Sequence, residues 1–186
     1  MNSHTIAMIG ISTLWFLSEV LINILTRSKK SEAVSYDKNS ISVIWIVILV
    51  SITIGIVIAF SFPRFSEVKY FSGILLILIG IAIRFIAIFS LKSYFNANVA
   101  IHHDHKLKTD GIYKKIRHPS YSGSLITSLG LGLTLGNWIS LLIIVLPIFG
   151  VFLYRIKIEE KALTDNFKKE YLDYQKRTKK LIPYVF

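Results

Sequence analysis

The sequence contains no cysteine, which excludes disulfide frameworks, cysteine-ligated zinc or iron–sulfur sites and thiol nucleophiles. Charged residues are also scarce: they make up 18% of the 186 residues, against about 25% in a typical soluble domain. Hydrophobic residues make up 53%, and the mean hydropathy is +0.55. These proportions exclude an ordinary soluble domain and indicate a protein that folds in a lipid bilayer.

Acidic residues are half as numerous as basic ones, 11 against 22. In a soluble protein such an excess would suggest nucleic acid as a partner. In a chain with long apolar runs it agrees better with membrane topology and with an anionic membrane surface. We therefore expect the lipid bilayer, and no nucleic acid, as the partner of the basic residues.

Three apolar runs precede residue 92, each close to the roughly 20 residues that cross a bilayer: 6–25, 41–62 and 70–91. The first run is followed by its basic cluster, whereas a signal peptide carries positive charge before its core, so a retained span is expected. Glu19 and Arg84 fall inside spans. Because either charge is costly against lipid, we expect both to face the bundle or to snorkel, in a structural role.

The second half of the chain alternates polar and apolar segments. Residues 92–119 are too polar for hydrocarbon and are expected at or beyond the interface. Residues 121–154 are too long for one span and are interrupted at Gly136-Asn137, which predicts a helical hairpin whose glycine-rich first arm packs closely on its neighbours. Beyond Arg155, apolar residues recur at helical spacing from Leu163 to Tyr174, which predicts an amphipathic helix at the membrane surface.

These segments predict a single domain over residues 1–186, an all-α polytopic membrane bundle of about five transmembrane helices. Residues 1–91 supply three spans, and residues 92–183 supply the loop, the hairpin and the C-terminal amphipathic helix. Segments 27–40, 92–118 and 155–186 hold four, six and nine Lys or Arg residues, against two in 63–70. The positive-inside rule therefore predicts an outside N-terminus and a cytoplasmic loop and C-terminus.

Polar groups gather on this cytoplasmic side, beginning with His102, His103, Asp104 and His105. Histidine and aspartate suit zinc or iron. Adjacent residues rarely face one ion, however, and no further ligand set is evident. We expect a solvated loop here and no metal site.

Two further groups allow two interpretations each. Arg117-His118-Pro119 is either a plain helix start with a basic anchor or a helix N-terminus that binds an anionic group. Arg155 and Glu159 are either an i, i+4 ion pair worth about 0.2–0.5 kcal/mol or a site in which Glu159 holds an ammonium and Arg155 a carboxylate.

Taken together and in order, the polar motifs of the second half form a specific sequence pattern. The first three predicted spans contribute only their hydropathy to this pattern. The set comprises Lys106-Leu107, Gly111-Ile112-Tyr113, Arg117-His118-Pro119-Ser120-Tyr121-Ser122-Gly123, Asn137, Arg155, Glu159-Glu160, Phe167, Glu170-Tyr171, Tyr174 and Leu181-Ile182-Pro183. With these motifs, residues 92–183 resemble the isoprenylcysteine carboxyl methyltransferase family.

The resemblance implies a small membrane enzyme that moves a methyl group from S-adenosylmethionine to a lipidic or prenylated acceptor, with its active site on the cytoplasmic side. It also agrees with the absence of a Gly-rich nucleotide fingerprint. By position it implies that Arg155 and Glu159 are catalytic, with Arg155 on the substrate carboxylate. The implied cofactor-binding residues are Asn98, His105, Lys106, Leu107, Lys108, Gly111, Tyr113, His118, Pro119, Ser120, Tyr121, Glu159 and Glu160.

Several functions remain open at this point. A carboxylate acceptor needs no general base, since orientation and desolvation supply much of the rate. An amine acceptor, as in the related phospholipid N-methyltransferases, would need a base, for which Glu160 or His118 are the candidates. The same membrane architecture is also compatible with a nicotinamide-dependent (NADPH) membrane reductase or with a non-catalytic membrane scaffold.

Overall fold

The computed structural model describes residues 3–25, 34–35, 39–61, 67–91, 100–101 and 107–185. Almost all of these residues are helical, which confirms the all-α prediction. The elements are α1 (Ser3–Leu25), β1 (Val34–Ser35), α2 (Ser40–Ser61), α3 (Glu67–Leu91), β2 (Ala100–Ile101), the 3-10 helix η2 (Gly111–Lys114), α4 (Pro119–Leu135), α5 (Trp138–Phe167) and α6 (Lys169–Arg177). The two short strands pair antiparallel.

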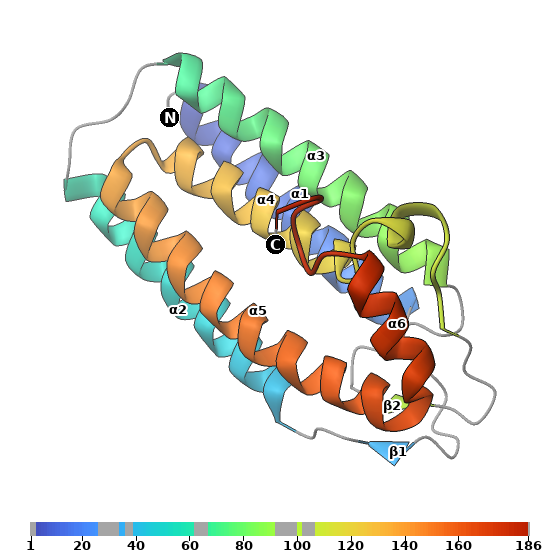
Figure 1. The fold of residues 1–186 in the computed structure, drawn as a ribbon. Helices are drawn as coiled ribbons and strands as arrows, with labels where there is room; N and C mark the ends of the chain where they lie inside the picture. The colour runs from blue at the N-terminus through green and yellow to red at the C-terminus, as the bar shows by residue number, and fades with distance from the viewer. Residues whose placement is uncertain are drawn as a thin grey trace.

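The long helices form a bundle in which successive helices alternate in direction (Figure 1). Helix α3 packs along α4 with α1 beside it, and α2 packs along α5. The hairpin of α4 and α5 joins these two groups. As a result, the end of α3, the start of α4 and the end of α5 meet at the same end of the bundle, where α6 also lies.

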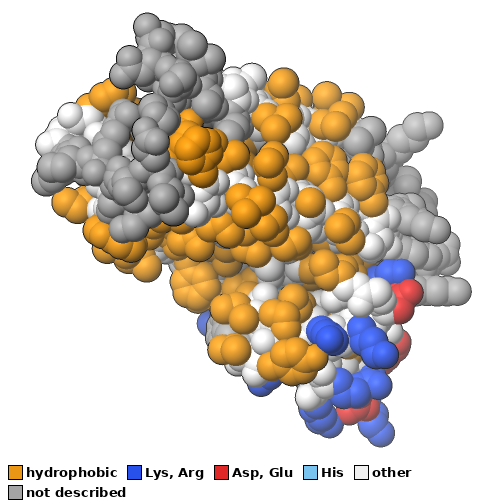
Figure 2. Space-filling view, turned by 90° about the horizontal axis from the view of Figure 1, so that it is seen from above, with side chains coloured by type: hydrophobic (Ala, Val, Ile, Leu, Met, Phe, Trp, Pro, Cys, Tyr) orange, Lys and Arg blue, Asp and Glu red, His pale blue; other side chains and the backbone are white. Residues whose placement is uncertain are grey.

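Within the described part of the chain, three helical segments are long and apolar enough to cross a membrane: Ser40–Ser61, Tyr70–Leu91 and Trp138–Phe167. Figure 2 shows one face of the molecule, on which hydrophobic side chains dominate the described part and the Lys, Arg, Asp and Glu side chains gather at the α6 end. The predicted membrane helix bundle is therefore confirmed. The number of five spans stays a prediction: in α1 the apolar segment found among the described residues is Thr13–Ile22, and α4 has 17 residues.

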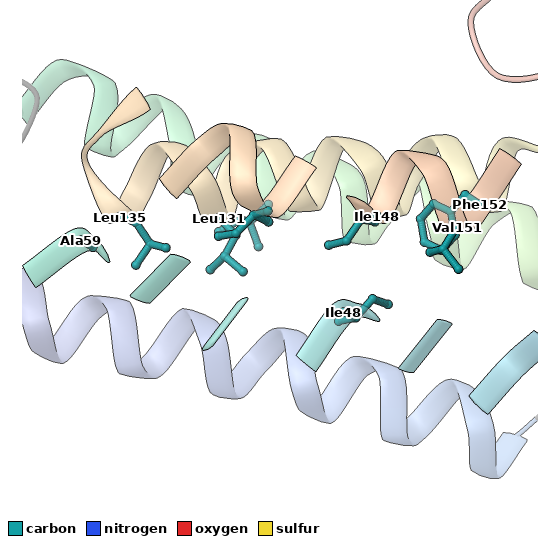
Figure 3. Close-up of a cluster of buried hydrophobic side chains, with 9 residues drawn as sticks. Ile48, Ala59, Leu131, Leu135, Ile148, Val151 and Phe152 are labelled. Carbon is teal, nitrogen blue, oxygen red and sulfur yellow. The ribbon is translucent and has the colours of Figure 1, made fainter. Parts of the chain in front are cut away.

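The main apolar core lies where α4 and α5 face α2. Leu131, Leu135, Ile148 and Phe152 belong to one buried cluster with Ile48 of α2 (Figure 3). Its side chains occupy successive turns along the bundle. This packing fixes the α4–α5 hairpin against α2 and so holds the site end of the hairpin in place.

The predicted hairpin is confirmed in its details. Gly136 ends α4 in the left-handed region at φ 88°, where glycine has no steric penalty. Asn137 then caps α5, and its side chain accepts a hydrogen bond from the Ser140 backbone N–H at 2.8 Å. The expected close packing of the first arm is also present: a Cβ added at Gly80 of α3 would lie 2.5 Å from the carbonyl oxygen of Gly123.

The C-terminal amphipathic helix is present but shorter than expected. Helix α5 continues past Arg155 to Phe167, and α6 has nine residues. Between them Lys168 adopts a positive φ of 47°, which breaks the helix. The prediction of one helix that carries the apolar residues from Leu163 to Tyr174 is therefore wrong, because these residues are divided between α5 and α6.

Candidate functional site

The site is built around the first turn of α4. Pro119 occupies the first helical turn, where its missing N–H costs no hydrogen bond. The residues before it pair with the C-terminal segment: the Arg117 N–H donates to the Lys179 carbonyl at 2.8 Å, and the His118 N–H donates to the Lys180 carbonyl at 3.0 Å. The chain beyond α6 is thereby fixed beside the start of α4.

Glu160 of α5 is surrounded by basic groups. Its Oε1 lies 2.9 Å from Arg117 Nε and 3.4 Å from His118 Nε2, and its Oε2 lies 3.4 Å from Lys180 Nζ. Arg117 also donates to the Thr178 carbonyl at 2.5 Å. Glu160 therefore joins α5, the start of α4 and the C-terminal segment.

Glu159 has a different set of partners. It accepts hydrogen bonds from the Tyr121 hydroxyl at 2.5 Å and from Arg155 Nε at 3.1 Å, and its Oε2 lies 3.5 Å from His118 Nδ1. Its side chain is 23% exposed, against 12% for Glu160. Of the two adjacent carboxylates, Glu159 therefore has the more exposed side chain.

Arg155 is the most deeply buried cation of the cluster, with a side chain 2% exposed. Besides Glu159, it donates a hydrogen bond to the Ser40 hydroxyl at the start of α2. The i, i+4 ion pair is thus present, but it is not an exposed surface pair. Its burial and its contact to a second helix connect α2 to the site.

The His118 imidazole lies between the two glutamates. Burial opposes its charged form, but the hydrogen bonds and negative charges of Glu159 and Glu160 outweigh burial, so the pKa of His118 is raised above its usual value. The two glutamates therefore favour the imidazolium form of His118.

One buried hydroxyl near this cluster has no hydrogen-bond partner. Tyr171 of α6 is 1% exposed, and its hydroxyl makes no hydrogen bond within the described part of the chain. Burial, and then the negative charge of Glu160, raise the pKa of Tyr171. A buried hydroxyl without a hydrogen-bond partner is costly, which makes the Tyr171 hydroxyl a candidate for a hydrogen bond to a bound ligand or water.

The structure brings together five of the residues expected from the sequence: His118, Tyr121, Arg155, Glu159 and Glu160. Ser120 points to the opposite side, where it accepts a hydrogen bond from Arg84 at 3.0 Å. Pro119 is buried at the helix start.

The expected residues before α4 are less closely joined to this cluster. Tyr113 is buried, donates to the Ala87 carbonyl at 3.2 Å and accepts at its backbone from Tyr174. Lys108 pairs with Asp110 at 2.7 Å, Leu107 is half-buried, and Gly111 has a positive φ of 58°. Asn98, His105 and Lys106 lie outside the described residues.

Sequence reasoning missed the partners that come from distant segments: Ser40, Thr178 and Lys180. Nothing in the local sequence marks them. Within the described ranges no group of three or more His, Asp or Glu side chains is placed to hold a metal ion. The histidine-rich segment 102–105 lies outside those ranges.

A bundle of membrane helices with a partly buried ionised cluster at one end defines an integral membrane protein with an interfacial site. The isoprenylcysteine carboxyl methyltransferase family matches residues 73–165, which include the start of α4 and the whole Arg155–Glu160 segment. Among relatives, a rice protein named "Probable protein-S-isoprenylcysteine O-methyltransferase" (Oryza sativa subsp. indica) is 34% identical over 131 residues, covering 68% of this chain and 69% of the relative. The Rattus norvegicus protein-S-isoprenylcysteine O-methyltransferase is 34% identical over 127 residues, covering 66% of this chain and 45% of the relative.

The fold agrees with these relatives. A solved structure of the eukaryotic intramembrane Ras methyltransferase ICMT matches with a TM-score of 0.64 and 30% identity, over 76% of this chain and 52% of that one. This chain therefore spans about half the length of that solved structure. The chain belongs to the isoprenylcysteine carboxyl methyltransferase family. The predicted family and the predicted class of enzyme, a membrane methyltransferase, are confirmed.

Proposed function

We propose that this chain transfers a methyl group from S-adenosylmethionine to the carboxylate of an isoprenylated cysteine, in a site on the cytoplasmic side of the membrane. The observation that carries the proposal is the Arg155–Glu159–Tyr121 cluster: a buried cation beside a partly exposed carboxylate. The names of the relatives support the acceptor, and the excess of basic residues at this end of the chain supports the cytoplasmic side.

The residues of the site fit the cofactor. S-adenosylmethionine carries an ammonium and a carboxylate as well as the electrophilic methyl group that it supplies when bound. Glu159 is partly exposed, and beside its contacts with Tyr121, Arg155 and His118 its carboxylate, which has about four lone-pair sites, can still accept a hydrogen bond from an ammonium. The Tyr171 hydroxyl, buried without a partner, offers a further donor on the α6 side.

The other residues of the cluster orient these groups. The Tyr121 hydroxyl and the Arg155 guanidinium fix the position of the Glu159 carboxylate. Arg155 is also our candidate for the carboxylate of the acceptor, because a buried guanidinium binds carboxylates in a fixed planar geometry. Orientation in a site shielded from water then lowers the barrier, with no proton to be moved.

The state of the two candidate bases favours a carboxylate acceptor over an amine. His118 lies between two carboxylates, which favour its protonated form, and Glu160 is paired with Arg117, His118 and Lys180. Neither is well suited to take a proton from an ammonium acceptor. The site therefore suits O-methylation better than N-methylation.

The test measures methyl transfer from S-adenosylmethionine by the detergent-purified protein to farnesylated N-acetylcysteine and to phosphatidylethanolamine. We expect methylation of the cysteine derivative alone, and about tenfold weaker S-adenosylmethionine binding in Glu159→Gln, since a charge-assisted hydrogen bond becomes a neutral one. Asp165→Asn also replaces a carboxylate by an amide, but on the exposed side of α5, and is therefore the matched control. Methylation of the amine alone would overturn the proposed acceptor, and equal affinity in both variants would remove Glu159 from the cofactor site.

A further inference from the structure

A second ionised cluster lies away from the glutamates, among the membrane helices. Arg84 of α3 faces Glu19 of α1: Nε lies 2.8 Å from Oε1, and Nη2 donates to Oε2 at 2.9 Å. Both side chains are largely buried, with 18% and 8% exposed. From the sequence, both charges were expected to face the bundle or to snorkel; they face the bundle, where they form an ion pair that contains one hydrogen bond.

The same guanidinium also holds the start of α4. Its Nη1 donates to the Ser120 hydroxyl at 3.0 Å and to the Ser124 hydroxyl at 2.8 Å. These two serines are four residues apart and therefore lie on one face of α4. Arg84 thus connects α1, α3 and α4 through one rigid planar group.

The backbones of α3 and α4 are in close contact at this level. A Cβ added at Gly123 would lie 2.8 Å from the Arg84 backbone nitrogen and 2.6 Å from the Gly80 carbonyl oxygen. This contact leaves little freedom for α3 to move relative to α4. The guanidinium is therefore held at a fixed place beside the first two turns of α4.

The turn that Arg84 holds is the one that carries the site. His118 immediately precedes α4, and Tyr121 follows Ser120 in its first turn. Successive residues of a helix point about 100° apart. Ser120 can therefore face Arg84 while Tyr121 faces Glu159, so that the first turn lies between the two ionised clusters.

We propose that the Glu19–Arg84 pair is a positioning device for the active site: through Ser120 and Ser124 it sets the rotation and depth of the first turn of α4. The orientation of Tyr121 and His118 relative to the two glutamates follows from that setting. The expected effects on kcat rest on the proposed function, whereas the positioning of α4 by Arg84 does not depend on it.

The decisive variant removes the contact to α4 and leaves the ion pair intact. Ser120→Ala/Ser124→Ala deletes both hydroxyls that accept from Arg84. Ser128→Ala is the matched control, since the Ser128 hydroxyl donates within α4 to the Ser124 carbonyl at 2.8 Å. We expect the double variant to lose about tenfold or more in kcat, because small misplacements of reacting groups have large rate effects, and the control to keep the wild-type kcat.

A merely structural role predicts a different pattern. In that case the double variant would unfold at a lower temperature while its kcat, its KM and its affinity for S-adenosylhomocysteine stayed at wild-type values. That result would overturn the inference. Arg84→Lys provides a second test: a single ammonium cannot donate to Glu19, Ser120 and Ser124 in the planar geometry of the guanidinium, so we expect kcat to fall here as well, and an unchanged kcat would count against the proposal.

The failure of the proposed function can be distinguished from the failure of this inference. The imidazole resonances of His118, assigned by comparison with His118→Gln, report its contacts with the glutamates without any substrate or cofactor. We expect these resonances to shift in Ser120→Ala/Ser124→Ala and not in Ser128→Ala. A wild-type protein that binds no S-adenosylhomocysteine would refute the proposed function, while unshifted resonances in the double variant would refute the positioning role alone.

Discussion

Replacing Glu160 by glutamine is expected to destabilise the protein markedly, even though the two side chains have nearly the same shape. Glu160 is the common partner of Arg117, His118 and Lys180, and its side chain is 12% exposed. Removing one member of a buried ion pair costs about 3–5 kcal/mol, because the other charge stays buried without compensation. The change would therefore leave Arg117, itself 7% exposed, without its counter-ion.

The lower end of that range applies here. Glutamine keeps one acceptor oxygen, and Arg117 keeps its hydrogen bonds to the Thr178 and Gln175 carbonyls. We therefore expect a loss of about 3 kcal/mol in the free energy of unfolding. The assay is reversible unfolding by sodium dodecyl sulfate in mixed micelles, followed by circular dichroism.

Asp173→Asn is the matched control. Asp173 pairs with Lys176 at 2.8 Å on the exposed side of α6, and exposed pairs of this kind contribute little. Hydrogen exchange of the Lys179 amide, which donates to the Lys115 carbonyl at 3.1 Å, should be faster in Glu160→Gln and unchanged in Asp173→Asn. If the two variants showed equal stability and equal exchange, Glu160 would not be what holds the C-terminal segment.

Three further changes test other parts of the structure. Gly80→Ala should lower the free energy of unfolding by about 1–3 kcal/mol, because the added methyl group forces α3 away from α4. In the same unfolding assay Gly150→Ala should not destabilise the protein, since, outside its own turns of helix, no atom of the described residues lies within 4 Å of its added Cβ. Because the pKa of His118 is raised, its contribution to stability is complete below its ordinary pKa of about 6.5 and is lost as the pH rises through the raised value. In His118→Gln the free energy of unfolding should therefore fall less between pH 6 and alkaline pH than it does in the wild-type protein. Arg155→Lys should lower kcat/KM for a carboxylate acceptor more than it weakens S-adenosylhomocysteine binding, and the reverse pattern would exchange the roles of Arg155 and Glu159.

The helices were predictable from the sequence because each apolar run ends at charged, proline or glycine residues that set a physical limit to it. The hairpin at Gly136-Asn137 is an example, since the left-handed cap and the side-chain cap are both local features. The extension of α5 to Phe167 was not predictable in this way. Helical periodicity continues across the membrane boundary, and the break at Lys168 depends on a positive φ that lysine rarely adopts.

The site was predictable as a set of residues, but the separate environments of its members were not. The order of the motifs brought His118, Tyr121, Glu159 and Glu160 into one candidate site. Adjacent residues on a helix face different neighbours, however, so Glu159 and Glu160 differ through partners some 40 residues away. The meeting of Glu19 with Arg84, 65 residues apart, follows in the same way from tertiary packing and not from any local pattern.

The central claim is that the cluster around Glu159 binds a methyl donor. Calorimetric titration of the detergent-purified wild-type protein and of Glu159→Ala with S-adenosylhomocysteine and with NADPH tests it most directly. Our account predicts that S-adenosylhomocysteine binds to the wild-type protein, that Glu159→Ala abolishes this binding, and that NADPH binds to neither. Binding of NADPH alone, or no binding of S-adenosylhomocysteine to folded wild-type protein, would contradict it.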